Sequence, residues 1–476
     1  MDYCSFIDGQ WHDGHGQHAN LNPSDLDDTI GLAGYADAAL VDEAVQAARR
    51  ALPAWALSLP AQRAEMLQRI ANALAERKDA LGELLAREEG KTLPEAIGEV
   101  GRAAQIFGFF AGECLRGAGE LLPSVRPGVA VEITREPVGV CALITPWNFP
   151  IAIPAWKIAP ALAHGNCVVF KPAELVPASA VALARIIEAA GVPRGVFNLV
   201  LGAGAVGAAL VNHPGVDAVS FTGSQATGAA VAAATLPRLA RVQLEMGGKN
   251  PQLVLDDADL DVAVNVCVQS AFFSTGQRCT AASRLIVTEG IYPRLVAALT
   301  ARTAALKVGH ALQAGTEIGP VADERQLAKD LNAIAAARAA GATLACGGQL
   351  LQREHRGHYL APALFVDTTP EMAINRDEIF GPVASVLRVR DYDEALAVAN
   401  DTPFGLSAGI ATSSLKYASH FKRHAQAGMV MVNLPTAGVD YHVPFGGRKG
   451  SSHGPREQGR MAAEFYTVVK TAYTWA

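Results

Sequence analysis

Two patterns of hydrophobic and polar positions alternate along this chain. Between residues 60 and 89 the apolar side chains recur at mostly helical spacing, at Leu67, Ile70, Leu74, Leu81, Leu84 and Leu85. Pro60 precedes this run and Gly90 follows it, as is typical of the start and end of a helix. We therefore expect one long amphipathic helix over 60–89.

The second pattern has a period of two and predicts strands. Residues 129–134 alternate apolar and polar side chains, as in a half-exposed strand, and residues 464–474 are similarly strand-like. Although far apart in sequence, these two segments could pair with each other, or with a second subunit through an exposed edge.

Between these segments, short apolar runs alternate with Ala-rich helical stretches such as 177–190. The runs are residues 138–145, 166–170, 197–201, 216–221 and 241–245. Continuous apolar strands separated by helices predict a parallel sheet covered on both faces, and a second α/β half follows from about 255 to 446. Because ligands of such sheets bind beyond the carboxyl ends of the strands, the residues after each run are candidates for a site.

Composition narrows the class of protein. The chain has 476 residues, of which 50% are hydrophobic and 18% charged, with a net charge of -6. These values favour a compact enzyme with a small-molecule partner over a nucleic-acid-binding or membrane protein. Seven scattered cysteines and an N-terminus without a signal-like apolar segment predict a reducing, cytoplasmic location.

Three residues are candidates for catalysis. Cys279, in FFSTGQRCT, could be a thiolate nucleophile or a buried structural thiol. Glu245, at a strand end before two glycines in LEMGGKN, could be a general base or a solvated carboxylate. Asn148, between two prolines in TPWNFP, could donate to an oxyanion or simply form a turn.

Other motifs suggest phosphate, ribose or metal binding. GAGAVG at 202–207 has the GxGxxG spacing, but that pattern occurs readily in a chain with 45 glycines. FTGS at 221–224 is an equally good turn from strand to helix, and Lys171 and Glu174 in FKPAE could hold ribose hydroxyls or cap a helix. His12, His15 and His18 match no closed ligand set and fall in an expected hairpin loop, so we predict no metal.

Seven motifs together resemble the aldehyde dehydrogenase superfamily over essentially the whole chain. In order they are TPWNFP, FKPAE, FTGS, LEMGGKN, FFSTGQRCT, DEIFGP (377–382) and PFGGRKGS (444–451). The resemblance implies an α/β fold with a Rossmann-like NAD(P)-binding domain, a catalytic domain and a small β oligomerisation element. We place the first at 1–121 and 142–254, the second at 255–445 and the third at 122–141 and 460–476, in a homodimer or homotetramer.

The resemblance also assigns roles to individual residues. Cys279 matches the nucleophile, Glu245 the general base and Asn148 the oxyanion donor, so the implied reaction oxidises an aldehyde to an acid through a cysteine thioester. The residues that the resemblance assigns to NAD or NADP are Lys171 and Glu174 at the adenosine ribose, Ser224 at the pyrophosphate, Glu378 and Phe380 at the nicotinamide ribose, and Thr145, Trp147 and Gly223 around them.

The C-terminal stretch 430–473 resembles the branch that oxidises 2-oxoglutarate semialdehyde to 2-oxoglutarate in sugar-acid or hydroxyproline breakdown. The alternatives are succinate semialdehyde or another aliphatic or aromatic aldehyde, transfer of the thioester to coenzyme A, and a catalytically silent structural relative. Arginines that hold the carboxylate in some succinate semialdehyde enzymes match Trp156 and Phe273 here. Arg278 and Arg456 are the remaining candidates for that contact.

Overall fold

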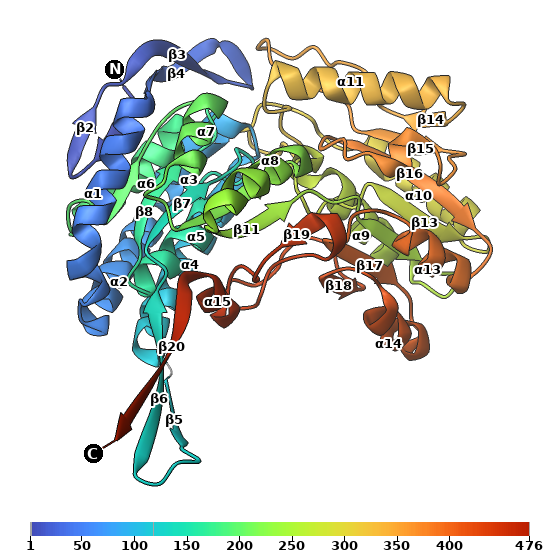
Figure 1. Cartoon of the computed structure of the whole chain (residues 1–476). Coiled ribbons are helices and arrows are strands. Elements are labelled where there is room, and N and C mark those ends of the chain that lie inside the picture. The colour runs from blue at the N-terminus through green and yellow to red at the C-terminus, as the bar shows by residue number, and fades with distance from the viewer. Residues whose placement is uncertain (1, 118, 476) are drawn as a thin grey trace.

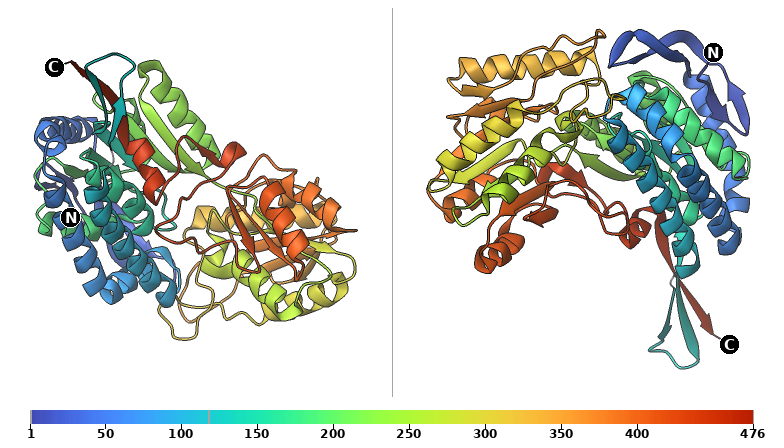
Figure 2. Two further views of the ribbon diagram at one scale, coloured as in Figure 1. Left: turned by 90° about the horizontal axis from the view of Figure 1, so that it is seen from below. Right: turned by 180° about the vertical axis from the view of Figure 1, so that it is seen from behind.

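Two sheets with helices packed around them lie side by side, and a narrow β arm projects from one of them (Figure 1). The computed structural model describes residues 2–117 and 119–475. Both views in Figure 2 show the same two bodies, with the C-terminus at the end of the arm.

The first sheet has eight strands in the order β19-β11-β10-β7-β8-β9-β1-β2. Its strands are β1 (Ser5–Ile7), β2 (Gln10–His12), β7 (Val140–Ile144), β8 (Cys167–Lys171), β9 (Phe197–Leu199), β10 (Ala218–Gly223), β11 (Arg241–Met246) and β19 (Ser452–His453). The five apolar runs form its centre, and they pair in parallel, as predicted. Every residue of β7 and β8 is buried, because helices cover both faces.

The second sheet has seven strands in the order β14-β15-β16-β13-β12-β17-β18. Its strands are β12 (Pro251–Val254), β13 (Arg284–Thr288), β14 (Thr343–Cys346), β15 (Ala363–Val366), β16 (Val383–Val389), β17 (Ser407–Ala411) and β18 (Met429–Val432). All neighbours pair in parallel except β14 and β15. Strand β12 lies in this sheet, whereas the domain boundary expected after residue 254 puts its four residues in the cofactor-binding domain.

The arm contains β5 (Glu120–Pro123), β6 (Val129–Pro137) and β20 (Thr467–Trp475). Strand β20 pairs antiparallel with β6 over nine residues, so the two strand-like segments pair with each other within one chain. The C-terminal strand begins at Thr467, later than expected, because Ala463–Tyr466 form the short helix α15.

Two groups of helices pack against the sheets. The first group is α1 (Ala38–Ala56), α2 (Pro60–Glu76), α3 (Lys78–Glu89), α4 (Leu93–Glu113), α5 (Ala152–Ala163), α6 (Pro177–Ala189), α7 (Gly204–Asn212) and α8 (Gln225–Thr235). The second group is α9 (Leu260–Phe272), α10 (Tyr292–Ala304), α11 (Glu324–Ala339), α12 (Ala373–Arg376), α13 (Tyr392–Asn400) and α14 (Leu415–His424). Short 3-10 turns are η1 (Cys114–Arg116), η2 (Leu236–Arg238), η3 (Phe273–Gly276), η4 (Lys449–Ser451) and η5 (Arg460–Ala462).

The expectation of one helix over 60–89 is wrong. Arg77 leaves the helical conformation, with φ -102° and ψ 11°, so that α2 ends and α3 begins at once. The apolar residues of both helices pack on α4. Leu74 and Leu81 are seven residues apart, two helical turns, and the break therefore leaves no mark in the apolar spacing.

The three N-terminal histidines lie in strands rather than in a loop. His12 ends β2, and His15 and His18 belong to β3 (His15–Asn22), which pairs with β4 (Asp25–Tyr35). His15 contacts Asp37 at 3.0 Å and His18 stacks on Tyr35. Within residues 2–117 and 119–475, no group of three or more His, Cys, Asp or Glu side chains is arranged to hold a metal ion. In the same ranges, no helix combines the length and the apolar character needed to span a bilayer.

Candidate active site

A cavity of about 330 Å³ lies beyond the carboxyl ends of β7, β8, β10 and β11. Its lining includes all eight residues predicted to bind the cofactor, namely Thr145, Trp147, Lys171, Glu174, Gly223, Ser224, Glu378 and Phe380. Asn148 and Cys279 also line it. We call it the cofactor-side cavity. None of the glycines in GAGAVG lines it, although Gly204 begins α7.

Cys279 lies in a tightly held loop between η3 and β13. Before it, Ser274 and Thr275 adopt left-handed backbone angles, with φ 50° and 56°, a conformation that a β-branched residue rarely tolerates. Glu95 Oε1 accepts hydrogen bonds from the Ser274 backbone N–H at 2.8 Å and from its Oγ at 3.0 Å. Asn250 Nδ2 donates to the Cys279 carbonyl at 2.7 Å. These contacts fix where the thiol lies.

The half-buried Cys279 also lines a second cavity of about 330 Å³, which we call the aldehyde-side cavity. The lining residues are Glu95, Gly98, Glu99, Arg102, Phe149, Ala152, Ile153, Trp156, Ser274, Arg278, Cys279, Thr280, Ala437, Gly438, Val439, Phe445 and Gln458. A molecule bonded to Cys279 in the aldehyde-side cavity can therefore contact a second molecule in the cofactor-side cavity. Of the residues matched by the resemblance to carboxylate-binding arginines, Trp156 lines this cavity and Phe273 does not.

Burial, together with the nearby carboxylates of Glu378 and Glu245, raises the pKa of the Cys279 thiol to about 12, although the N–H groups of Cys279 and Thr280 oppose this rise. The thiol is therefore protonated at neutral pH in this state. Its proton must leave before, or as, the sulfur attacks a carbonyl.

Asn148 is held through its backbone and through its side chain. Its carbonyl accepts from Lys91 Nζ at 2.6 Å, and its Nδ2 donates to the Gln277 carbonyl at 2.9 Å. Lys91 is fully buried and also pairs with Glu99 at 2.7 Å. One N–H of the Asn148 amide remains to donate into the site. Nothing in the sequence singled out Lys91, because its contact with Asn148 joins residues that are distant along the chain.

Glu245 is buried next to the site but lines neither cavity. Its Oε2 accepts from Ser452 Oγ at 2.6 Å, whereas its Oε1 has no hydrogen-bond partner among the described residues. Burial raises its pKa well above the ordinary value, and Glu457 adds to the effect. Glu457 in turn pairs with the buried Lys157.

The cofactor-side cavity suits a ligand with hydroxyl and phosphate groups. The buried hydroxyls of Thr145 and Thr222 line it and have no partner within the described residues. Ser224 is the N-cap of α8, whose N-terminal N–H groups favour an anion.

Two further residues give this cavity a cation and an aromatic wall. Lys171 Nζ donates to the Pro172 carbonyl at 2.7 Å, and burial lowers the pKa of Lys171 to about 8. Trp147 meets Phe380 edge-on, with ring centroids 5.6 Å apart. A dinucleotide offers partners for all of these groups.

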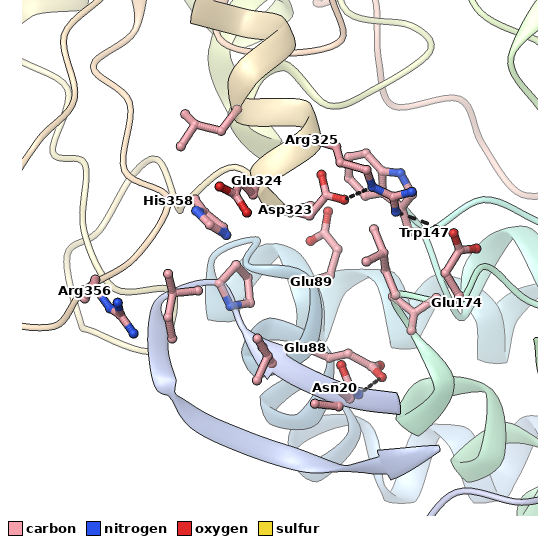
Figure 3. A pocket seen from close by; sticks show the side chains of 18 residues that line it. Asn20, Glu88, Glu89, Trp147, Glu174, Asp323, Glu324, Arg325, Arg356 and His358 are labelled. Carbon is pink, nitrogen blue, oxygen red and sulfur yellow. Dashed lines mark hydrogen bonds and ion pairs between the residues drawn. The ribbon is translucent and has the colours of Figure 1, made fainter. Parts of the chain in front are cut away.

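A third cavity, of about 720 Å³, adjoins the first and shares Trp147 and Glu174 with it (Figure 3). Its lining is acidic, and neither Cys279 nor Asn148 belongs to it. Arg325 lies between Asp323, at 3.0 Å, and Glu174, at 3.5 Å. This arginine partly offsets the negative charge of Glu174.

Comparison with known proteins matches residues 11–472 to the aldehyde dehydrogenase family. The chain belongs to this family. It is 43% identical to the α-ketoglutaric semialdehyde dehydrogenase of Bacillus subtilis (strain 168), over 99% of this chain and 98% of that protein. It is equally 43% identical to the α-ketoglutarate semialdehyde dehydrogenase of Haloferax volcanii, with 98% of each chain covered.

The fold agrees with this assignment. A crystal structure of the betaine aldehyde dehydrogenase of Staphylococcus aureus in complex with NAD+ superposes with a TM-score of 0.97 at 33% identity, covering 100% of this chain and 95% of that one. The predictions of an aldehyde dehydrogenase fold and of an NAD(P)-dependent aldehyde dehydrogenase are therefore confirmed.

Proposed function

We propose that this aldehyde dehydrogenase oxidises 2-oxoglutarate semialdehyde to 2-oxoglutarate through a thioester on Cys279. The position of Cys279 between the two cavities carries the proposal for the mechanism. The names of the two relatives at 43% identity, matched over nearly the whole chain, support the substrate.

The reaction begins when the Cys279 sulfur forms a bond to the aldehyde carbon and the thiol proton leaves. The carbonyl oxygen becomes an oxyanion, which accepts hydrogen bonds from the Asn148 amide and the Cys279 backbone N–H. A nicotinamide held by the residues of the cofactor-side cavity would supply the acceptor for the hydride that leaves this carbon. The thioester then remains on Cys279. Glu245 takes a proton from water, the water oxygen bonds to the thioester carbon, the carbon–sulfur bond breaks, and the acid leaves with the thiol restored.

For the cofactor, we propose that Lys171 and Glu174 hold the adenosine ribose and that Ser224, with the start of α8, holds the pyrophosphate. Thr145, Trp147, Gly223, Glu378 and Phe380 would complete the site, as they line the same cavity. A carboxylate at 174 repels a 2′-phosphate, but Arg325 lies 3.5 Å from it. We therefore infer that both NAD and NADP are accepted.

At the level of domains, we propose that 1–121 and 142–254 bind the cofactor and that 255–445 supply the nucleophile. The segments 122–141 and 460–476, which contain most of the arm, would join subunits in a homodimer or homotetramer located in the cytoplasm. The exposed apolar side chains of the arm, such as Leu121 at 82% and Trp475 at 80% exposure, support a role in assembly.

The main alternative is succinate semialdehyde, which is one carbon shorter and has no 2-oxo group. The deciding experiment compares kcat/KM for 2-oxoglutarate semialdehyde, succinate semialdehyde and benzaldehyde, each with NAD and with NADP. We expect at least about a tenfold lead for the first aldehyde, equal to roughly 1.4 kcal/mol. A flat profile, or a lead for another aldehyde, would contradict the substrate assignment and leave the thioester mechanism intact.

A further inference from the structure

The aldehyde-side cavity contains four charged residues, and its two carboxylates are already engaged. Glu99 Oε1 accepts from the backbone N–H groups of Ile151 and Ala152 at 2.9 and 3.0 Å, and its Oε2 pairs with Lys91. Glu95 is bound to Ser274. Neither carboxylate is therefore placed to bind a substrate group. The charge of a ligand that fits this cavity depends on its two arginines, Arg102 and Arg278.

Arg278 is held by the protein through its Nη2, whereas its buried Nε has no partner among the described residues. Its guanidinium donates to the carbonyls of Gln269 and Ser270 near the C-terminal end of α9, where a cation offsets the partial negative charge of the helix. Arg456, the other candidate from the sequence, does not line the cavity. With its Nη2 held on α9, Arg278 has little freedom to move toward an anionic substrate, which favours another cation of the cavity for this contact.

Arg102 meets that requirement. It lies on α4, half-buried, and donates one N–H to the Val439 carbonyl, which belongs to the loop on the other side of the cavity. Within the part of the chain that the structure describes, no carboxylate lies within 4.0 Å of its guanidinium. Burial lowers the pKa of Arg102, and the carboxylate of Asp440, which is near but not in salt-bridge contact, opposes this effect only in part. A substrate carboxylate in direct contact would stabilise the charged guanidinium further.

A second group in the same cavity also lacks a partner. Gln458 is completely buried, and neither its Nε2 nor its Oε1 has a hydrogen-bond partner within the described residues. The indole N–H of Trp156 is likewise unpaired in the same wall. Buried amides in proteins are almost always hydrogen-bonded, so an unpaired one in a cavity wall indicates a polar ligand.

We propose that Arg102 binds the distal carboxylate of the substrate and that Gln458 Nε2 donates to its 2-oxo oxygen. This assignment rests on the proposed function and makes it more specific. Arg102 selects for an anionic aldehyde, whereas Gln458 distinguishes a 2-oxo acid from the acid that lacks the oxo group. The cavity, at about 330 Å³, is near the lower end of the roughly 300–1,000 Å³ typical of ligand sites and so suits a small substrate.

The test for Arg102 compares glutarate semialdehyde with pentanal, which has the same chain length but no carboxylate. In Arg102→Met, we expect the kcat/KM for glutarate semialdehyde, divided by that for pentanal, to fall by about 100-fold. Most of this fall should come from a higher KM for glutarate semialdehyde. Arg102→Lys should recover part of the ratio, because it keeps the charge but not the planar fork. Arg338→Met, at an exposed arginine of α11, is the matched control and should leave the ratio unchanged.

The test for Gln458 compares 2-oxoglutarate semialdehyde with glutarate semialdehyde, which differ only in the oxo group. Gln458→Met should lower the ratio of kcat/KM for the first to that for the second by about tenfold. Because both substrates are measured on one preparation, a partial loss of folded enzyme cancels in the ratio.

The outcomes separate this inference from the proposed function. A wild-type enzyme that does not prefer 2-oxoglutarate semialdehyde over benzaldehyde contradicts the proposed substrate. A wild-type enzyme with that preference whose Arg102→Met and Gln458→Met variants keep both ratios contradicts this inference alone. If Arg278→Met, rather than Arg102→Met, removes the preference for the carboxylate, the assignment of Arg102 is also wrong.

Discussion

At the scale of single residues, the environment of Cys279 predicts how the free enzyme reacts with an alkylating agent. With the pKa of its thiol raised to about 12, only on the order of one molecule in 10⁵ carries the thiolate at pH 7. The alkylation rate at Cys279 should therefore rise about tenfold per pH unit from pH 7 to pH 10 without a plateau. Iodoacetamide labelling followed by mass spectrometry of the Cys279 peptide measures this rate. A plateau below pH 9 would show that the thiol ionises far more easily than its burial implies.

Asn148 gives a second prediction at this scale. Asn148→Ala removes the side-chain donor to the oxyanion while the backbone contact to Lys91 remains. We expect kcat to fall by about 10²- to 10³-fold, or roughly 2.7–4 kcal/mol, with a small change in KM. Steady-state kinetics with the preferred aldehyde measure the loss. Asn265→Ala, at an exposed position of α9, is the control and should keep full activity.

The sequence indicated some of these residues and missed others, for a physical reason. Cys279, Glu245 and Asn148 stand beside strand ends or glycines, where local pattern predicts an exposed functional group. Arg102 and Gln458 lie within a helical pattern and a loop, with no local sign of function. They are candidates because both line the cavity, Arg102 without a salt bridge and Gln458 without a hydrogen bond among the described residues. Contacts between residues far apart in sequence become visible only in the fold. The catalytic and cofactor roles themselves remain predictions.

At the scale of elements, Glu88 joins three segments that are distant in sequence. From the end of α3, its carboxylate accepts from Asn20 Nδ2 of β3 at 2.6 Å and from the Ala178 and Ser179 backbone N–H groups at 2.6 and 2.9 Å. Those N–H groups open α6, whose own N-cap residue, Val176, provides no side-chain cap. Glu88 therefore caps a helix to which it is not adjacent in sequence.

Removing this cap should destabilise the protein. Glu88→Ala leaves several buried N–H groups unpaired, and we expect the free energy of unfolding to fall by about 3 kcal/mol in denaturant titrations. Glu88→Gln keeps an acceptor oxygen and should lose clearly less. Equal losses in the two variants would mean that the charge of Glu88, and not its hydrogen bonds, stabilises the start of α6.

The same carboxyl predicts a dependence of stability on pH. Burial raises the pKa of Glu88 from 4.5 to about 7, despite its hydrogen bonds. A raised pKa in the folded state stabilises the protein below the unfolded value, and that contribution is lost as the pH rises through the folded value. The stability of the wild-type protein relative to Glu88→Gln should therefore decrease between pH 4.5 and pH 8. A difference that is constant over this range would contradict the raised pKa.

The elements themselves were predicted unequally. The five apolar strands, and the strands β6 and β20, follow from periodicity, because the burial of each side chain is set by its position in its own strand. The pairing of β6 with β20 was one of two alternatives that periodicity left open. The break between α2 and α3 does not follow, since the apolar spacing continues across Arg77. The sheet to which β12 belongs depends on hydrogen bonds to β13 and β17, which no local pattern records.

At the scale of the whole molecule, the arm is the feature whose apolar side chains a single chain leaves exposed. Three strands leave the body of the protein (Figure 1), and apolar side chains lie exposed on them, including Leu121, Val469, Tyr473 and Trp475 at 82%, 59%, 60% and 80%. A long exposed edge strand with apolar side chains invites pairing with another chain. A second copy of the chain that covers this surface would bury the apolar side chains and protect the exposed strand edge.

The proposed assembly can be tested on the arm directly. Leu121→Glu combined with Trp475→Glu introduces two charges into this apolar surface, and we expect the homodimer or homotetramer to dissociate to monomers in sedimentation-velocity experiments. Leu415→Glu, at an equally exposed leucine of α14 outside the arm, is the control and should assemble as the wild type does. A wild-type protein that sediments as a monomer would contradict the proposed assembly. A double variant that stays assembled would place the subunit interface elsewhere on the surface.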